Sequence, residues 1–192
     1  MYTTVKITTQ IFEAVEFLHR NNIFHSDIKP SNIMFTAENN VKLCDFGIAV
    51  HLQTIVASQS SKRAGDIFYM SPERIKGEHR SAENDIWSVG ATFITMVTGA
   101  SLNSTDGPIL APSNISQYKL SFGGKGRDEM LADFPNDYSI LIKEIISKTI
   151  VQKPLRGNAK ELLNLCNTFW ETLQTSASTE YPIFEYTIQY YR

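Results

Sequence analysis

Several features that would assign this 192-residue chain to a common class are scarce in its sequence. It has two cysteines, Cys44 and Cys166, which form no CxxC or Cys/His cluster, so neither a zinc site nor a disulfide framework is indicated. No stretch approaches eighteen consecutive apolar residues, and the first ten residues lack the apolar region of a signal peptide. We therefore expect a cytoplasmic protein with free thiols that does not bind membranes.

The chain also lacks an excess of either charge. Its 18 Lys and Arg residues against 20 Asp and Glu residues give a formal net charge of -2, and no basic stripe with interleaved aromatics is present. A nucleic-acid partner is therefore not expected. The hydrophobic content of 42% is enough to build the core of one ordinary domain.

Four segments have the apolar periodicity of helices. They are residues 4–19, 85–98, 138–150 and 159–173. Residues 85–98 are apolar around most of the helix circumference, which predicts a central helix buried on nearly all sides. Asn158, followed three residues later by Glu161, is a candidate N-cap for the last helix.

The remaining segments are short strands and connections. "IMF" and "VKLC" flank "TAENN", which suits a turn, so residues 33–44 predict a hairpin. Residues 47–65 show no sustained period and predict a long loop, and residues 101–137 predict an irregular connection with one short helix. Residues 183–192 alternate like a strand. No composition break indicates a second domain.

The loop "HSDIKPSNIMF", residues 25–35, brings three polar side chains close together in sequence. Asp27 can take a proton, Lys29 can hold a phosphate, and the amide oxygen of Asn32 can bind a hard metal ion. The same residues are also ordinary for a solvated turn that leads into a strand. Taken alone, the loop leaves both interpretations open.

Three further motifs accompany this loop, namely "KLCDFG" at 42–47, "YMSPERI" at 69–75 and "DIWSVG" at 85–90. In this order and at these spacings, the set resembles the C-terminal lobe of a eukaryotic protein kinase, most closely a MAP kinase kinase. The resemblance implies a mainly α fold with a small β-hairpin at the catalytic loop. It covers residues 1–173 as a partial kinase domain, with residues 174–192 as a tail.

The resemblance also implies roles for individual residues. Asp27 would accept or orient the proton of the substrate hydroxyl, and Lys29 would contact the phosphate transferred from ATP. Asn32 and Asp45 would supply oxygens to Mg²⁺. ATP and Mg²⁺ are therefore the expected cofactors.

Other residues would support this site. Glu73 is expected to pair with Arg156, and Asp85 to hydrogen-bond the backbone of the catalytic loop, in which His25 is a further support. Cys44 is expected to be a small buried hydrophobe rather than a reactive thiol. Four hydroxyl residues in the segment where the family is phosphorylated are candidate phosphosites, with solvated loop hydroxyls as the alternative. They are Thr54, Ser58, Ser60 and Ser61.

Two substitutions depart from the family pattern. Ser26 replaces the catalytic-loop arginine that pairs with an activation-segment phosphate in many kinases, which puts activation by that pairing in doubt. Lys62 and Arg63 are candidates for a substitute cationic site. Asp66 replaces a threonine, and its carboxylate is expected to crowd Asp27 and compete for Lys29.

A larger departure is the lack of a G-x-G-x-x-G strand pair, a V-A-I-K lysine and a helix that bears its partner Glu. We therefore expect the N-terminal lobe to be absent from this chain. The expected function is transfer of the ATP γ-phosphate to Ser or Thr, and also Tyr, of a protein substrate, with a MAP kinase as substrate and an upstream kinase as activator. The alternative is an inactive pseudokinase or a docking module that uses the aromatic tail.

Overall fold

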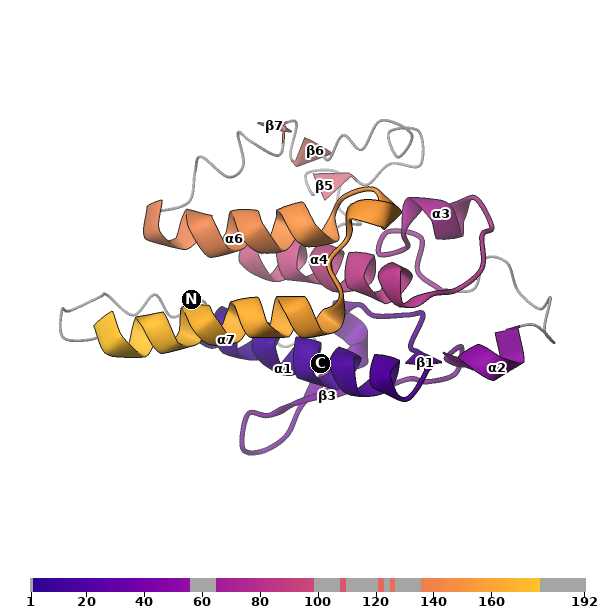
Figure 1. The fold of residues 1–192 in the computed structure, drawn as a ribbon, viewed down its shortest axis with the longest axis horizontal. Coiled ribbons are helices and arrows are strands. Elements are labelled where there is room, and N and C mark those ends of the chain that lie inside the picture. The colour runs from indigo at the N-terminus through magenta and orange to yellow at the C-terminus, as the bar shows by residue number, and fades with distance from the viewer. Residues whose placement is uncertain are drawn as a thin grey trace.

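The computed structural model describes residues 2–55, 65–98, 108–109, 121–122, 125–126 and 136–176. Four long helices carry the fold (Figure 1), namely α1 (Tyr2–Arg20), α4 (Ala82–Thr98), α6 (Asn136–Thr149) and α7 (Ala159–Ser176). Helix α7 packs along α1, α6 packs along α4, and α1 also contacts α4. All four predicted helices are confirmed, and none of the described helices is long and apolar enough to cross a bilayer.

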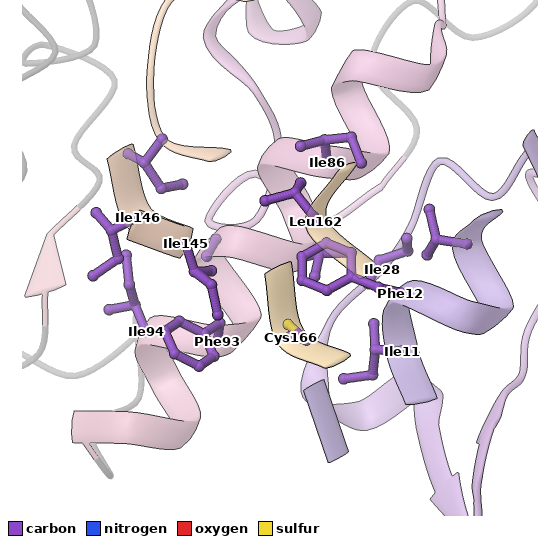
Figure 2. Packing of buried hydrophobic residues seen from close by; sticks show 14 of the residues in the cluster. Ile11, Phe12, Ile28, Ile86, Phe93, Ile94, Ile145, Ile146, Leu162 and Cys166 are labelled. Atoms are coloured by element: carbon purple, nitrogen blue, oxygen red, sulfur yellow. The ribbon is translucent and has the colours of Figure 1, made fainter. Parts of the chain in front are cut away.

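The core lies between these helices because each of them turns its apolar side inward. Helix α4 is buried on nearly all sides, as predicted, with Trp87 and Phe93 each 2% exposed. Figure 2 shows Phe93 and Ile94 near Ile145 and Ile146 of α6, and Phe12 near Ile28 and Leu162. The part of the core between α1 and α7 therefore supports the loop that contains Ile28.

Gly90 allows α4 and α6 to approach closely. A Cβ atom at this position would lie 2.3 Å from Oγ1 of Thr149 and 2.6 Å from its Cβ, which real side chains do not tolerate. The Thr149 hydroxyl is already held, since it donates to the carbonyl of Ile145 at 2.7 Å. The small residue in "DIWSVG" is therefore explained by helix packing.

Cys166 of α7 lies in this core with no exposed surface. Burial raises the pKa of its thiol to about 12, which makes it an unreactive hydrophobe. Cys44 is also a free thiol, as expected, but it is partly exposed, so the expectation that its side chain is buried is wrong.

The predicted hairpin is present as β2 (Ile33–Phe35) and β3 (Val41–Leu43), which pair antiparallel with Ile33 opposite Leu43. The 3₁₀ helix η1 (Pro30–Asn32) leads directly into β2. A second pair joins β1 (Ile23–Phe24) to β4 (Val50–His51), and the short helix α2 (Leu52–Ile55) follows β4.

The prediction of an irregular loop from residue 47 is therefore wrong for residues 50–55. Strand β4 forms because it meets β1, a partner about 27 positions away that local periodicity does not reveal. Residues 56–64, which include Ser58, Ser60, Ser61, Lys62 and Arg63, lie outside the described residues, and Thr54 lies in α2.

The connection between α4 and α6 also differs from the prediction where it is described. Strands β5 (Pro108–Ile109), β6 (Ser121–Phe122) and β7 (Lys125–Gly126) form a small antiparallel sheet. The short helix expected there and the strand expected at 183–192 lie outside the described residues. The short helices α3 (Pro72–Ile75) and η3 (Lys153–Leu155) complete the described elements.

Helix α7 begins with the predicted capping box. The side chain of Asn158 accepts the N–H of Glu161 at 3.0 Å, and the Glu161 carboxylate accepts the N–H of Asn158 at 3.0 Å. We expect Asn158→Ala to lower the free energy of unfolding by about 1 kcal/mol, measured by urea denaturation. The matched control is Asn164→Ala on the exposed side of the same helix, which removes no cap. Equal midpoints for the two variants would contradict the prediction.

Candidate active site

The carboxylate of Asp85 fixes the shape of the loop that follows β1. Asp85 lies in the first turn of α4, is 1% exposed, and accepts the N–H of His25 at 2.9 Å and the N–H of Ser26 at 2.8 Å. It also lies 2.9 Å from Nε2 of His19 in α1, a residue that sequence reasoning missed. Because Ser26 has a φ of 69°, this part of the loop needs the support that Asp85 gives.

The imidazole of His25 connects this loop to the segment after β3. Its Nδ1 accepts the N–H of Asp27 at 3.3 Å, and its Nε2 lies 3.1 Å from the carbonyl oxygen of Cys44. These two partners assign a neutral ring with its hydrogen on Nε2. The ring centroid also lies 4.7 Å from that of Phe46. His25 therefore lies between the loop with Asp27 and the segment with Asp45.

The structure brings Asp27, Lys29 and Asn32 together, as their spacing suggested. Nζ of Lys29 lies 3.1 Å from Oδ2 of Asp27, and Nδ2 of Asn32 donates to the same oxygen at 3.0 Å and to the Asp27 carbonyl at 2.8 Å. The side chain of Asp27 is 12% exposed and that of Lys29 is 21% exposed. The carboxylate is thus oriented from several sides and still reaches the surface.

Asp45 follows β3 after one intervening residue and is exposed. The N–H of the preceding Cys44 donates to the carbonyl of Asn32 at 2.9 Å, which holds the two segments side by side. Asp45 has a φ of 62°, and its carboxylate accepts the N–H of Gly47 at 3.2 Å.

These oxygens suit a hard divalent cation that keeps substrate phosphates and waters among its ligands. Nδ2 of Asn32 is directed at Asp27, so the amide oxygen of Asn32 faces away from the Asp27 carboxylate. Asp45 adds a second carboxylate, which is exposed. The part of the chain that the structure describes holds no group of three or more His, Cys, Asp or Glu residues that could enclose a metal ion. The described residues therefore do not surround a metal ion with protein ligands on all sides, and Mg²⁺ does not require this.

Asp66 does not crowd Asp27 in the way the sequence suggested. Its main-chain N–H donates to Oδ1 of Asp27 at 3.1 Å, and its own carboxylate accepts the N–H of Phe68 at 3.1 Å. The ammonium group of Lys29 pairs with Asp27. The expectation was wrong because the turn that begins at Gly65, with a φ of 119°, presents the backbone of Asp66 rather than its side chain to Asp27.

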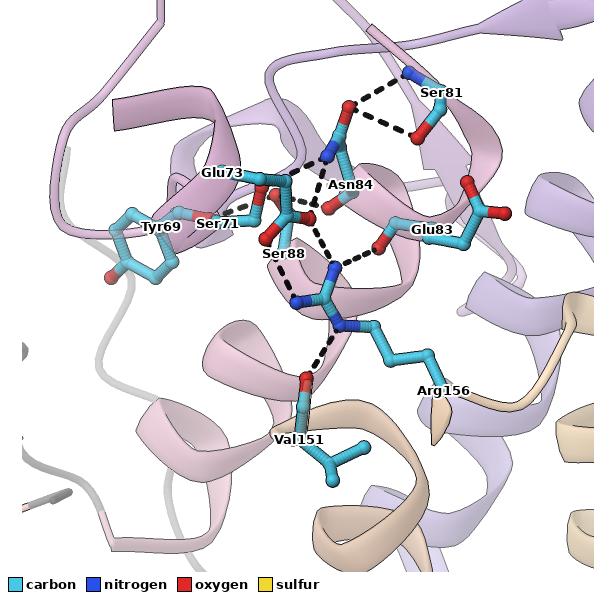
Figure 3. Close-up of polar contacts among 9 residues, drawn as sticks. All are labelled: Tyr69, Ser71, Glu73, Ser81, Glu83, Asn84, Ser88, Val151 and Arg156. Carbon is cyan, nitrogen blue, oxygen red and sulfur yellow. Dashed lines mark hydrogen bonds and ion pairs between the residues drawn. The ribbon is translucent and has the colours of Figure 1, made fainter. Parts of the chain in front are cut away.

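Glu73 and Arg156 form a buried ion pair at the base of this region (Figure 3). Nη2 of Arg156 donates to Oε2 of Glu73 at 3.0 Å, and Nη1 donates to Oε1. Arg156 also donates to the carbonyls of Val151 and Glu83, both at 2.9 Å, and lies over the ring of Trp87. Burial raises the pKa of Glu73, but the hydrogen bonds and charge of Arg156 outweigh this effect and hold that pKa below its usual range.

Sequence reasoning missed the polar residues that complete this cluster. Nδ2 of Asn84 donates to Oε1 of Glu73 at 2.8 Å and to the Ser71 hydroxyl at 3.0 Å, and the Ser88 hydroxyl donates to the carbonyl of Tyr69 at 2.8 Å. Asn84 directly precedes Asp85 and so connects the two buried acids. A small pocket beside Asp27 is also lined by Asn84, Ser71, Ser88 and Tyr69.

This chain is similar to a known protein family and to several curated proteins. The model for the protein kinase domain matches residues 2–166. Mitogen-activated protein kinase kinase kinase 3 of Homo sapiens is 45% identical over 97 residues, which is 50% of this chain and 16% of that protein. A MAP kinase kinase of Saccharomyces cerevisiae is 34% identical over 126 residues, which is 65% of this chain and 24% of that protein.

A more distant relative matches over a longer part of the chain. A probable serine/threonine-protein kinase of Clostridium acetobutylicum is 32% identical over 162 residues, which is 83% of this chain and 23% of that protein. The chain therefore spans less than a quarter of the length of these curated relatives.

Proposed function

We propose that this chain, which belongs to the protein kinase family, carries the C-terminal lobe of a MAP kinase kinase-like Ser/Thr kinase. The complete enzyme would transfer the γ-phosphate of ATP to hydroxyl groups of a protein, including Tyr in a dual-specificity enzyme. The observation that carries this proposal is the convergence of Asp27, Lys29 and Asn32, with Asp45 held beside Asn32 by the Cys44 N–H. This arrangement has the acceptor, the cation and the metal oxygens that phosphoryl transfer requires.

The contacts suggest what each side chain does. Asp27, oriented by the amide of Asn32 and by the N–H of Asp66, is placed to orient the substrate hydroxyl and accept its proton. Lys29, whose side chain is 21% exposed, would turn from Asp27 to the transferred phosphate and neutralise its charge. Asn32 and Asp45 would hold Mg²⁺, which with ATP supplies the electrophilic phosphorus and neutralises the leaving group.

Exposed apolar side chains support the proposal that a second lobe covers this site. Met34 on β2 is 58% exposed and Phe46 is 45% exposed, although both lie beside the proposed catalytic residues. Large apolar side chains that are exposed beside a functional site suggest a surface that is covered in the working protein. We propose that residues 1–173 form the lobe described here, that residues 174–192 are a tail, and that a nucleotide-binding lobe covers Met34 and Phe46.

The names of the relatives suggest a place in signalling. Two of them are kinases of mitogen-activated protein kinase cascades, so we propose a MAP kinase as the protein substrate and an upstream kinase as the activator. That kinase would act on the segment with Thr54, Ser58, Ser60 and Ser61. We also propose a cytoplasmic location.

Ser26 favours the second candidate function, a pseudokinase or docking module, because it removes a cation from the catalytic loop.

The experiment that separates the two functions is a nucleotide-induced thermal shift and a phosphotransfer assay on the full-length protein, each with and without Mg²⁺. We expect Asp45→Asn to lower phosphotransfer about 100-fold or more, because the charge stabilisation of the metal is worth several kcal/mol. The control is Glu144→Gln, an exposed carboxylate on α6.

The two functions give different results in this experiment. If the wild type shows neither a Mg²⁺-dependent shift nor phosphotransfer, the enzyme proposal fails and the docking module remains. Deletion of residues 180–192 then tests whether partner binding depends on the tail, and unchanged binding would exclude docking through it.

A further inference from the structure

Position 26 offers no positive charge to the segment that follows Asp45. The hydroxyl of Ser26 donates to the carbonyl of Phe24 at 3.4 Å, and its N–H donates to Asp85. The short side chain is thus directed back toward β1. A charged contact to the segment after Asp45 must come from another residue.

Arg80 makes such a contact from the connection between α3 and α4. Its Nη1 donates to the carbonyl of Ile48, which lies 32 positions earlier in the chain. Ile48 belongs to a turn closed by the N–H of Ala49, which donates to the carbonyl of Phe46 at 3.1 Å. This turn connects Asp45 to β4, so a residue that holds Ile48 also restrains Asp45.

Arg80 interacts electrostatically with Asp85, the carboxylate that accepts the Ser26 N–H. Burial lowers the pKa of the Arg80 guanidinium, and the Asp85 carboxylate, which also accepts the Ser26 N–H, opposes that shift. Burial and then the charge of Arg80 lower the pKa of Arg74, which lines the pocket beside Ser26. Arg80 therefore contacts the segment after Asp45 directly, through Ile48, and shares with Ser26 an interaction with Asp85.

We propose that Arg80 is a positioning residue that supplies the cation missing at position 26 and, through the carbonyl of Ile48, holds the turn between Asp45 and β4. The contact of Arg80 with Ile48 is made to a main-chain carbonyl, so this contact needs no phosphate. The turn is therefore fixed without phosphorylation of the segment beyond it. The importance of Asp45 for Mg²⁺ rests on the proposed function, whereas the contact itself does not.

Hydrogen exchange of the full-length protein tests this proposal without any need for activity. We expect Arg80→Met to accelerate exchange of the amides of residues 47–51 about 10- to 100-fold, because a hydrogen bond from a charged donor is lost. Amides in the middle of α4 should keep their rates. Arg80→Lys, which keeps the charge, should give an intermediate rate, and it remains informative if the Met variant does not fold. Lys76→Met, an exposed cation in the same connection, is the matched control.

A second-site variant tests whether Arg80 stands in for position 26. We expect Ser26→Arg in the Arg80→Met background to restore most of the protection of residues 47–51, and phosphatase treatment of the wild type to leave that protection unchanged. The proposal is overturned by unchanged exchange in Arg80→Met, by an equal acceleration throughout α4, by failure of the Ser26→Arg rescue, or by loss of protection after phosphatase. Failure of the phosphotransfer assay alone would refute the proposed function and leave these results standing.

Discussion

The Asp27→Asn variant of the full-length protein is expected to transfer phosphate about 10²- to 10⁴-fold more slowly than the wild type. The wild-type carboxylate accepts on both oxygens, from the Asp66 N–H on Oδ1 and from Asn32 and Lys29 on Oδ2. An Asn side chain has one acceptor oxygen, and its NH₂ group must face one of these donors. The variant therefore loses both the proton acceptor and part of its orientation.

Two measurements separate this chemical effect from a structural one. The Mg²⁺-dependent thermal shift with nucleotide should change little in Asp27→Asn, because the proposed metal oxygens belong to Asn32 and Asp45. Glu13→Gln, an exposed carboxylate on α1, should keep the wild-type rate. A wild-type rate in Asp27→Asn would contradict the role of Asp27, and loss of the nucleotide shift together with the rate would indicate a damaged site instead.

The helices could be predicted because their signals are local. Each has an apolar face repeated at helical spacing, and Asn158 with Glu161 marks the start of α7 within one turn of chain. The hairpin of β2 and β3 is equally local, with a short turn between its strands. Strand β4 was missed because its two residues pair with β1, which is distant in sequence, and the fold is needed to bring the two strands together.

In the candidate site, too, some contacts could be predicted from the sequence and others could not. Asp27, Lys29 and Asn32 lie within six positions, so their proximity follows from the sequence. The contacts of Asp66 with Asp27 and of Arg80 with Ile48 join residues 39 and 32 positions apart. For Asp66, the residue type led to a wrong prediction, because its main chain makes the contact with Asp27. The Asp66 carboxylate instead accepts the N–H of Phe68.

Removal of either partner of the buried ion pair is expected to cause the largest loss of stability. We expect Glu73→Gln and Arg156→Met each to lower the free energy of unfolding by about 3–5 kcal/mol, because each leaves an uncompensated buried charge. Nη1 and Nη2 of Arg156 both donate to Glu73, and the side chain of Arg156 has no exposed surface. The free energy of unfolding of a globular domain is only about 5–15 kcal/mol, so either loss is a large fraction of it.

The double variant Glu73→Gln with Arg156→Met should cost less than the sum of the single variants, because neither charge is then left alone. Urea denaturation at neutral pH measures all three, and Glu144→Gln is the exposed control. Additive losses would show that Arg156 acts through Val151, Glu83 and Trp87 rather than through Glu73.

The pH dependence of stability gives an independent check on this ion pair. The folded-state pKa of Glu73 lies below its ordinary value of 4.5, because Arg156 overcomes the opposite effect of burial. A carboxylate with a lowered pKa contributes stability that is complete above the unfolded-state pKa and is lost as the pH falls through the folded-state pKa. We therefore expect the difference in unfolding free energy between wild type and Glu73→Gln to be constant near neutrality and to shrink below about pH 4.5. Glu83 also has a lowered pKa but is present in both proteins, so its contribution cancels. A difference that stays constant into the acid range would show that the charge of Glu73 does not stabilise the fold.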